Sequence, residues 1–190
     1  NMEHRLLLDK INPRDWTVLV DGVSYPLMDK NFPTVNWEHP YELSEEEKDV
    51  MEKLKSSFLN SEKLQKHVEF LYTKGSLYKV YNGNLLYHGC VPLDENGEFK
   101  TVCLWGKNYR GRELYDIIEE YVRKGYYSLD KEEKQKGLDM LYFTWAHPDS
   151  PVFGKKKMAT FERYFIENTE THNEKKNPYY NLIDREEIVN

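Results

Sequence analysis

The most distinctive chemical feature of the sequence is His88, which is followed by Gly89 and Cys90 at the end of an expected strand. An imidazole held at the end of a buried strand is suited to binding a metal ion or a phosphate. The glycine beside it lets a ligand or backbone come close. The competing interpretation is a histidine packed in the core, which is the commoner role of a single histidine. On position alone, both interpretations stay open.

Basic side chains in two regions are candidates for contact with an anionic substrate. A guanidinium near a helix N-terminus binds anions well, because the helix dipole and free backbone donors add to its charge. The alternative is ordinary solvated surface charge, although Arg163 stands between aromatic residues and is expected to be partly buried. The substrate-phosphate candidates are Lys107, Arg110, Arg112, Lys155 and Arg163.

Four further histidines are expected to be structural or solvent-exposed, because they lie in polar or terminal segments or beside the apolar stripe of a helix. They are His4, His39, His67 and His172. The motifs GxxxxGK[ST], GxGxxG, GxSxG and HExxH do not occur, so nucleotide binding and a hydrolase triad have no support.

Composition narrows the class of protein. The 190 residues are 39% hydrophobic, 14% aromatic and 32% charged, which is typical of a globular chain. A formal net charge of -6 argues against nucleic acid or an anionic membrane as the main partner. Two cysteines without CxxC spacing indicate neither a disulfide framework nor a structural zinc site, and a reducing cytoplasmic setting is expected. No stretch has the pattern of a membrane span or a signal peptide.

The elements that must position these residues alternate irregularly between strands and helices, which predicts an α+β fold. Asp21-Gly22 and Asn82-Gly83 predict tight hairpin turns, and Ser44 with Glu47 predicts a capping box. Expected strands cover 16–20, 23–27, 77–81, 85–87 and 99–105. Expected helices, four or five in number, cover 45–59, 61–74, 110–124, 130–146 and the short stretch 158–165.

Gly75 and Gly125 are expected to end helices, with Ser128 as a candidate cap for the helix after it. Leu138, Leu141 and Trp145 are expected to face inward. The chain is predicted to be a single α+β piece of a longer protein, with both ends internal to that protein. Its parts are a hairpin and extended connector (1–43), a helical pair (44–75), strands bearing His88 (76–105), helices and a proline-rich loop (106–166), and a polar tail (167–190).

The segment around His88 resembles the central region of class III (Firmicutes-type) fructose-1,6-bisphosphatases. Residues 82–93 carry the resemblance most directly, reading Asn-Gly-Asn-Leu-Leu-Tyr-His-Gly-Cys-Val-Pro-Leu. Further matching segments are spread over most of the chain, at 61–65, 74–76, 106–107, 111–112, 150–155, 160–166, 171–172 and 176–180.

That family is similar to the calcineurin-like metallophosphoesterases, in which two metal ions lie at the ends of central strands and a His-Gly turn supplies a ligand. The resemblance implies a larger metallophosphoesterase domain with His88 as one ligand of a dinuclear manganese or magnesium site. It also implies a cytoplasmic hydrolase of carbohydrate metabolism that acts on fructose 1,6-bisphosphate in gluconeogenesis. Two such metals clamp a phosphate and activate a bound water.

The chain departs from the superfamily pattern in its other ligand segments. The superfamily also has Asp-x-His, Gly-Asp-x-x-Asp-Arg-Gly, Gly-Asn-His and a late Gly-His, and none of these occurs here. With one ligand segment of five, the chain alone is expected to bind no metal and to lack activity. The remaining ligands are then expected in the rest of the parent protein.

The expected partners are therefore a sugar bisphosphate and the remainder of the parent chain. Self-association is also expected, because strands that normally lie in a larger sheet would leave open edges. The alternative function is a non-catalytic helical insert that acts as a lid, a regulatory module or an oligomerisation module.

Overall fold

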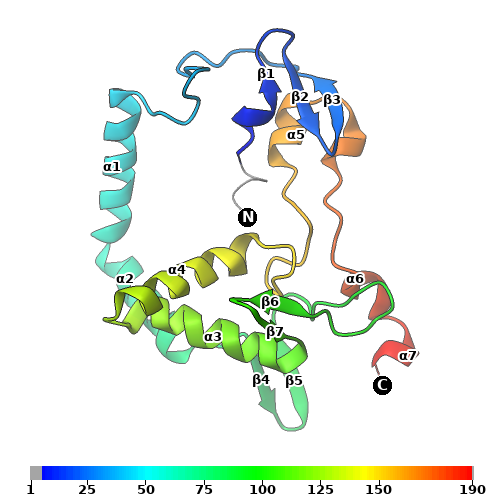
Figure 1. Cartoon of the computed structure of the whole chain (residues 1–190). Coiled ribbons are helices and arrows are strands. Elements are labelled where there is room, and N and C mark those ends of the chain that lie inside the picture. The colour runs from blue at the N-terminus through cyan, green and yellow to red at the C-terminus, as the bar shows by residue number, and fades with distance from the viewer. Residues whose placement is uncertain (1–5, 190) are drawn as a thin grey trace. The chain divides into compact units, whose positions relative to one another are not determined.

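The computed structural model describes residues 6–189 and confirms an α+β fold of short antiparallel hairpins and helices (Figure 1). The chain divides into two compact units. The first runs to Leu71 and resumes over Met158–Asn173, and the second contains Tyr72–Lys157 and continues from Glu174. His4 and the expected features of residues 1–5 lie outside the described residues.

The first unit is built on a three-stranded antiparallel sheet in the order β1 (Ile11–Asn12), β2 (Thr17–Val20) and β3 (Val23–Pro26). A short 3-10 helix, η1 (Leu8–Lys10), precedes it. The predicted hairpin is confirmed, with Val20 opposite Val23 and positive φ angles of 50° at Asp21 and 83° at Gly22. Strand β1 adds an edge that the sequence did not indicate.

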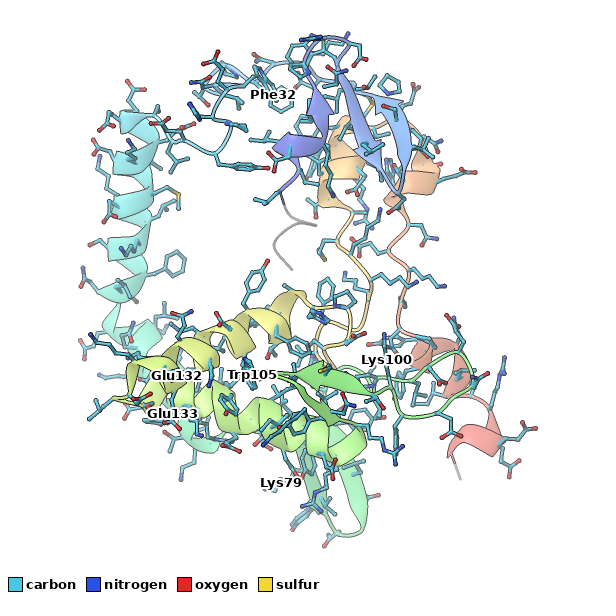
Figure 2. All side chains as sticks on the ribbon, viewed as in Figure 1. Phe32, Lys79, Lys100, Trp105, Glu132 and Glu133 are labelled. Carbon is cyan, nitrogen blue, oxygen red and sulfur yellow. The ribbon has the colours of Figure 1, made fainter. Side chains whose placement is uncertain are left out.

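Aromatic rings cover the apolar side of this sheet. Buried Val18 and Ile166 belong to a core against which Trp16, Phe32 and Phe165 pack. Phe32, labelled in Figure 2, stacks on Phe165 with ring centroids 5.7 Å apart. Helix α5 (Thr160–Phe165) and the 3-10 helix η2 (Thr169–His172) complete this part of the unit.

Helices α1 (Glu45–Leu59) and α2 (Glu62–Lys74) match the predicted helical pair. The capping box of α1 is complete: the Ser44 hydroxyl accepts a hydrogen bond from the Glu47 amide, and the Glu47 carboxylate accepts one from the Ser44 amide. No residue of either helix is buried.

The second unit contains two separate two-stranded hairpins. Strand β4 (Tyr78–Tyr81) pairs with β5 (Asn84–Tyr87) around the predicted Asn82-Gly83 turn. Strand β6 (Val102–Leu104) pairs with β7 (Lys107–Tyr109), which the sequence analysis missed. The predicted strand over 99–105 was therefore too long, and its end is a turn at Trp105 and Gly106, both with positive φ.

Helices α3 (Gly111–Tyr127) and α4 (Lys131–Ala146) cross at two glycines and enclose a core of Val102, Leu114, Ile118 and Met140. A Cβ atom added at Gly137 would lie 2.1 Å from the backbone nitrogen of Gly125. Gly125 is buried at this crossing and α3 continues past it, so its prediction as a helix stop was wrong.

The predicted inward face of α4 was also wrong in part. Trp145 is 72% exposed and Leu138 is 46% exposed, because the glycine crossing turns Gly137, Met140 and Thr144 toward the interior instead. The N-cap of α4 is Asp130, whose side chain accepts a hydrogen bond from the Glu133 amide, rather than Ser128.

The predicted polar tail contains more structure than expected. After η2, it forms the single-turn helices α6 (Tyr179–Leu182) and α7 (Glu186–Val189). Among the described residues, no helix combines the length and apolar character needed to cross a membrane.

Candidate functional site

His88 follows the last residue of β5 and lies at the exposed start of a turn whose next residues enter the core of the second unit. Leu85 and Leu86 of β5 are 55% and 54% exposed, so His88 is not at the end of a buried strand as predicted. It is not a packed core histidine either, because its side chain is exposed. The imidazole is accessible on a backbone that the following residues fix.

Gly89 and Cys90 fix that backbone against the loop at Pro151. The amide of Cys90 donates a hydrogen bond to the Pro151 carbonyl oxygen at 2.8 Å. Gly89 has a φ of 91°, and a Cβ atom there would lie 2.2 Å from the same oxygen. A side chain at position 89 would therefore force the two segments apart, so the glycine beside His88 is required by packing.

Tyr115 holds the other side of this turn from helix α3. Its buried hydroxyl donates a hydrogen bond of 2.8 Å to the Cys90 carbonyl oxygen. Burial raises the pKa of Tyr115 well above its usual value, with the nearby Cys90 thiol as a lesser cause. The hydroxyl consequently stays protonated and remains a donor at any pH near neutrality.

A third segment, at Asn177, closes the structure around residues 88–93. The buried Asn177 side-chain oxygen accepts hydrogen bonds from the amides of Leu93, at 3.2 Å, and Tyr179, at 3.0 Å. The Asn177 backbone amide donates a hydrogen bond to the Gly154 carbonyl oxygen. Three regions of the second unit that are distant in sequence are thereby joined, and we call residues 88–93, 150–154 and 177–180 the His88 junction.

Cys90 is fully buried in the His88 junction. Burial raises the pKa of its thiol to about 11, and a hydrogen bond with Tyr180 lowers it only in part. Because the thiolate is the nucleophilic form, Cys90 is a packing residue and not a nucleophile at neutral pH. Tyr87 and Tyr179 hydrogen-bond through their hydroxyls at the edge of the junction.

The residues predicted to contact substrate phosphates differ in their exposure and in the interactions that they already make. Lys107 is exposed on β7 and so does not lie at a helix start, while Arg110 is the exposed N-cap residue of α3. Arg112 is engaged within the unit: its Nε donates to the Tyr78 hydroxyl at 2.9 Å and lies 3.4 Å from an Asp116 carboxylate oxygen.

The last two candidates are also paired. Lys155 Nζ lies 2.6 Å from a Glu174 carboxylate oxygen in a half-buried ion pair. Arg163 was expected to be partly buried but is exposed, with Nη2 3.4 Å from the His172 carbonyl oxygen. Arg163 belongs to the first unit, whereas the other four candidates belong to the second.

Another polar cluster lies beside the junction, and its pairing of Lys100 with Asp149 was not predicted from the sequence. Lys100, labelled in Figure 2, forms an ion pair with Asp149, whose carboxylate also lies 3.9 Å from His147 Nδ1. The sequence carried only a weak signal for it, because Lys100 and Asp149 are 49 residues apart. Tyr115 and Asn177 were likewise missed as supports of the His88 turn.

The residues present do not fit a metal ion by themselves. In residues 6–189, no group of three or more histidine, cysteine, aspartate or glutamate side chains is arranged to hold one. His88 therefore belongs to no such group within this part of the chain, and dinuclear sites need several carboxylate and imidazole ligands.

Fold and site together define an α+β segment that presents the exposed His88 on a turn fixed by hydrogen bonds. The family model described as Firmicute fructose-1,6-bisphosphatase matches residues 1–190. The chain therefore belongs to the Firmicute fructose-1,6-bisphosphatase family.

Individual relatives agree with this assignment. The chain is 50% identical over 191 residues to fructose-1,6-bisphosphatase class 3 2 of Clostridium beijerinckii, with 100% of this chain and 29% of the relative covered. It is 53% identical over 191 residues to the class 3 protein of Alkaliphilus metalliredigens, covering 99% and 29%. The class 3 protein of Clostridium botulinum strain Loch Maree is 52% identical over 188 residues, covering 98% and 28%.

The chain spans less than a third of the length of these curated relatives. No solved structure matches it.

Proposed function

We propose that the chain is part of a metal-dependent phosphatase that hydrolyses fructose 1,6-bisphosphate to fructose 6-phosphate and phosphate in gluconeogenesis. The observation that carries this proposal is the family match over all 190 residues, together with relatives named fructose-1,6-bisphosphatase class 3 at about half identity. The proposal places the protein in the cytoplasm, in keeping with two free cysteines.

Within this proposal, His88 is one ligand for manganese or magnesium in the parent enzyme. Its accessibility on a turn fixed by Pro151, Tyr115 and Asn177 supports the assignment, because a ligand must be both reachable and held in place. The other ligands belong to the part of the parent protein that these 190 residues do not cover. The 190-residue chain alone is then inactive.

Lys107 and Arg110 are the stronger candidates for substrate phosphates. Both are exposed, whereas Arg112 and Lys155 are engaged with Asp116 and Glu174. Freeing a paired side chain would cost the ion pair it already makes, so unengaged cations bind an anion at lower cost.

The test is a His88→Ala variant of the full-length parent protein, assayed for bound manganese and for phosphate release from fructose 1,6-bisphosphate. We expect loss of stoichiometric manganese and a fall in turnover of at least a hundredfold. His67→Ala, at an exposed position of α2, is the matched control and should behave as wild type. Wild-type metal content and turnover in His88→Ala would refute the ligand assignment.

A second function, a non-catalytic helical insert, is favoured by one observation: α1 and α2 contain no buried residue. Under this alternative, His88→Ala leaves turnover intact, and deletion of residues 44–75 from the parent changes its regulation or oligomeric state. The two variants measured side by side separate the two functions.

A further inference from the structure

Helix α1 has the local features of a stable helix but lacks the cover that helices normally have. Its capping box is complete, and ion pairs join Glu45 to Lys48 and Glu52 to Lys55. A 15-residue helix is nevertheless marginal in water, and most helical stability in proteins comes from packing an apolar face. Within the first unit, to which α1 belongs, no residue of the helix is buried.

Four of the five large apolar residues of α1 form one continuous stripe, and Leu59 at the end of the helix lies outside it. Val50, Met51, Leu54 and Phe58 are 54%, 52%, 50% and 64% exposed. At about 100° per residue, these four positions fall within about 100° of one another around the helix axis, which is the width of a face that packs on a protein core. We call these four residues the α1 stripe.

The size of the α1 stripe limits what can cover it. Four side chains on a 15-residue helix offer far less than the about 800 Å² per partner that a stable interface between separate proteins buries. A segment of the same polypeptide does not pay the translational and rotational entropy of association, so a small face suffices for it. A second copy of the chain is disfavoured on the same ground.

The length of the relatives indicates a covalently linked segment that could cover the α1 stripe. The chain covers 28% to 29% of these relatives, so those proteins are more than three times as long as its 190 residues. We infer that the α1 stripe packs intramolecularly on the part of the parent phosphatase outside residues 1–190. This inference rests on the proposed function, because it takes the chain as a segment of that longer enzyme.

The experiment uses the full-length parent with the photo-cross-linking amino acid benzoylphenylalanine in place of Leu54. Ser56 is the matched control, because two residues turn the helix by about 200° and place it opposite the stripe. After irradiation, cross-linked peptides are mapped by mass spectrometry. We expect at least fivefold more product from Leu54 than from Ser56, with the Leu54 product joined to residues outside 1–190 of the same polypeptide.

Any other result overturns the inference. Cross-links between two copies would assign the stripe to self-association, and cross-links confined to residues 1–190 would place its cover within this chain. Equal yields from Leu54 and Ser56 would show that the stripe is uncovered. None of these readouts depends on turnover, so a failed docking inference is distinguishable from a failed assignment of His88.

Discussion

Two helical pairs with similar local sequence signals have opposite tertiary surroundings. Helices α3 and α4 cross at Gly125 and Gly137 and bury Leu114 and Ile118 completely. Helices α1 and α2 have comparable length, and α1 has the better N-terminal cap, but neither buries a single residue. Helix formation is thus encoded locally, whereas burial depends on a partner that the local sequence does not identify.

The largest expected effect on this contrast comes from the glycine crossing. In Gly137→Ala, the added methyl group would lie 2.1 Å from the Gly125 nitrogen and 2.5 Å from the Tyr121 carbonyl oxygen. These are backbone atoms that cannot move aside singly, so we expect the free energy of unfolding to fall by about 3 kcal/mol. Urea unfolding followed by circular dichroism measures it. Lys134→Ala, on the exposed side of α4, is the control, and a loss below about 1 kcal/mol in Gly137→Ala would contradict the close crossing.

The next largest effect on stability is expected at a carboxylate of α3 that is hydrogen-bonded to the residues just before β4. Glu119 accepts hydrogen bonds from the Leu77 amide, the Ser76 hydroxyl and Arg123. We expect Glu119→Gln to cost about 2 kcal/mol in unfolding free energy, because hydrogen bonds to a charged group are lost. Glu120→Gln, which removes an exposed partner of Lys124, should cost less than about 0.5 kcal/mol.

The Glu119 carboxylate also makes the free energy of unfolding depend on pH. Burial alone would raise the pKa of Glu119, but the bonds from Ser76, Arg123 and the Leu77 amide outweigh it and hold the pKa below its usual value. The stabilisation is therefore complete above the unfolded pKa of about 4.3 and is lost as the pH falls through the lower folded value. Wild type should lose more stability than Glu119→Gln on acidification below about pH 4.3. Parallel pH profiles of the two proteins would show that Glu119 is not the group responsible.

Removing the Tyr115 hydroxyl should have a smaller effect. Tyr115→Phe leaves the Cys90 carbonyl oxygen without its 2.8 Å hydrogen bond, at an expected cost of about 1 kcal/mol. Hydrogen exchange should quicken at the amides of Cys90 and Leu93, while Tyr109→Phe on β7 leaves both unchanged. Unaltered exchange in Tyr115→Phe would mean that the other two segments suffice to hold the His88 turn.

The smallest effect is expected on helix α1. In the 190-residue chain, Leu54→Ala should change the unfolding free energy by less than about 0.5 kcal/mol, because Leu54 is 50% exposed and alanine favours helix. Leu114→Ala, at a fully buried position of α3, should cost about 3 kcal/mol. Similar losses for the two leucines would remove the contrast between the helical pairs.

The sequence predicted well those parts of the fold that depend on interactions between residues close together in the chain. The capping box located α1 to the residue, and both Asp21-Gly22 and Asn82-Gly83 form the expected turns. Strand β7 was missed because its hairpin turns at Trp105, a bulky residue that rarely adopts its φ of 48°. Gly125 was wrongly predicted to end a helix because a helix stop and a close helix crossing both favour glycine. Only the partner helix distinguishes the two.

The candidate site was predictable mainly through His88. The sequence singled out His88, but the residues that hold its turn lie far along the chain: Tyr115 is 25 residues from Cys90, and Asn177 is 84 residues from Leu93. No periodicity relates positions so distant. The role of His88 as a ligand, and those of Lys107 and Arg110 toward phosphate, stay predictions.

The burial of Cys90 also determines which of the two thiols can react with oxidants. Peroxides and disulfides react with thiolates that solvent can reach, and Cys90 offers neither the ionised form nor access. Of the two thiols, Cys103 on β6 is the exposed one and is therefore open to such oxidation. Thiol oxidation would therefore begin at Cys103 on the β6–β7 hairpin and leave Cys90 unmodified in the turn that carries His88.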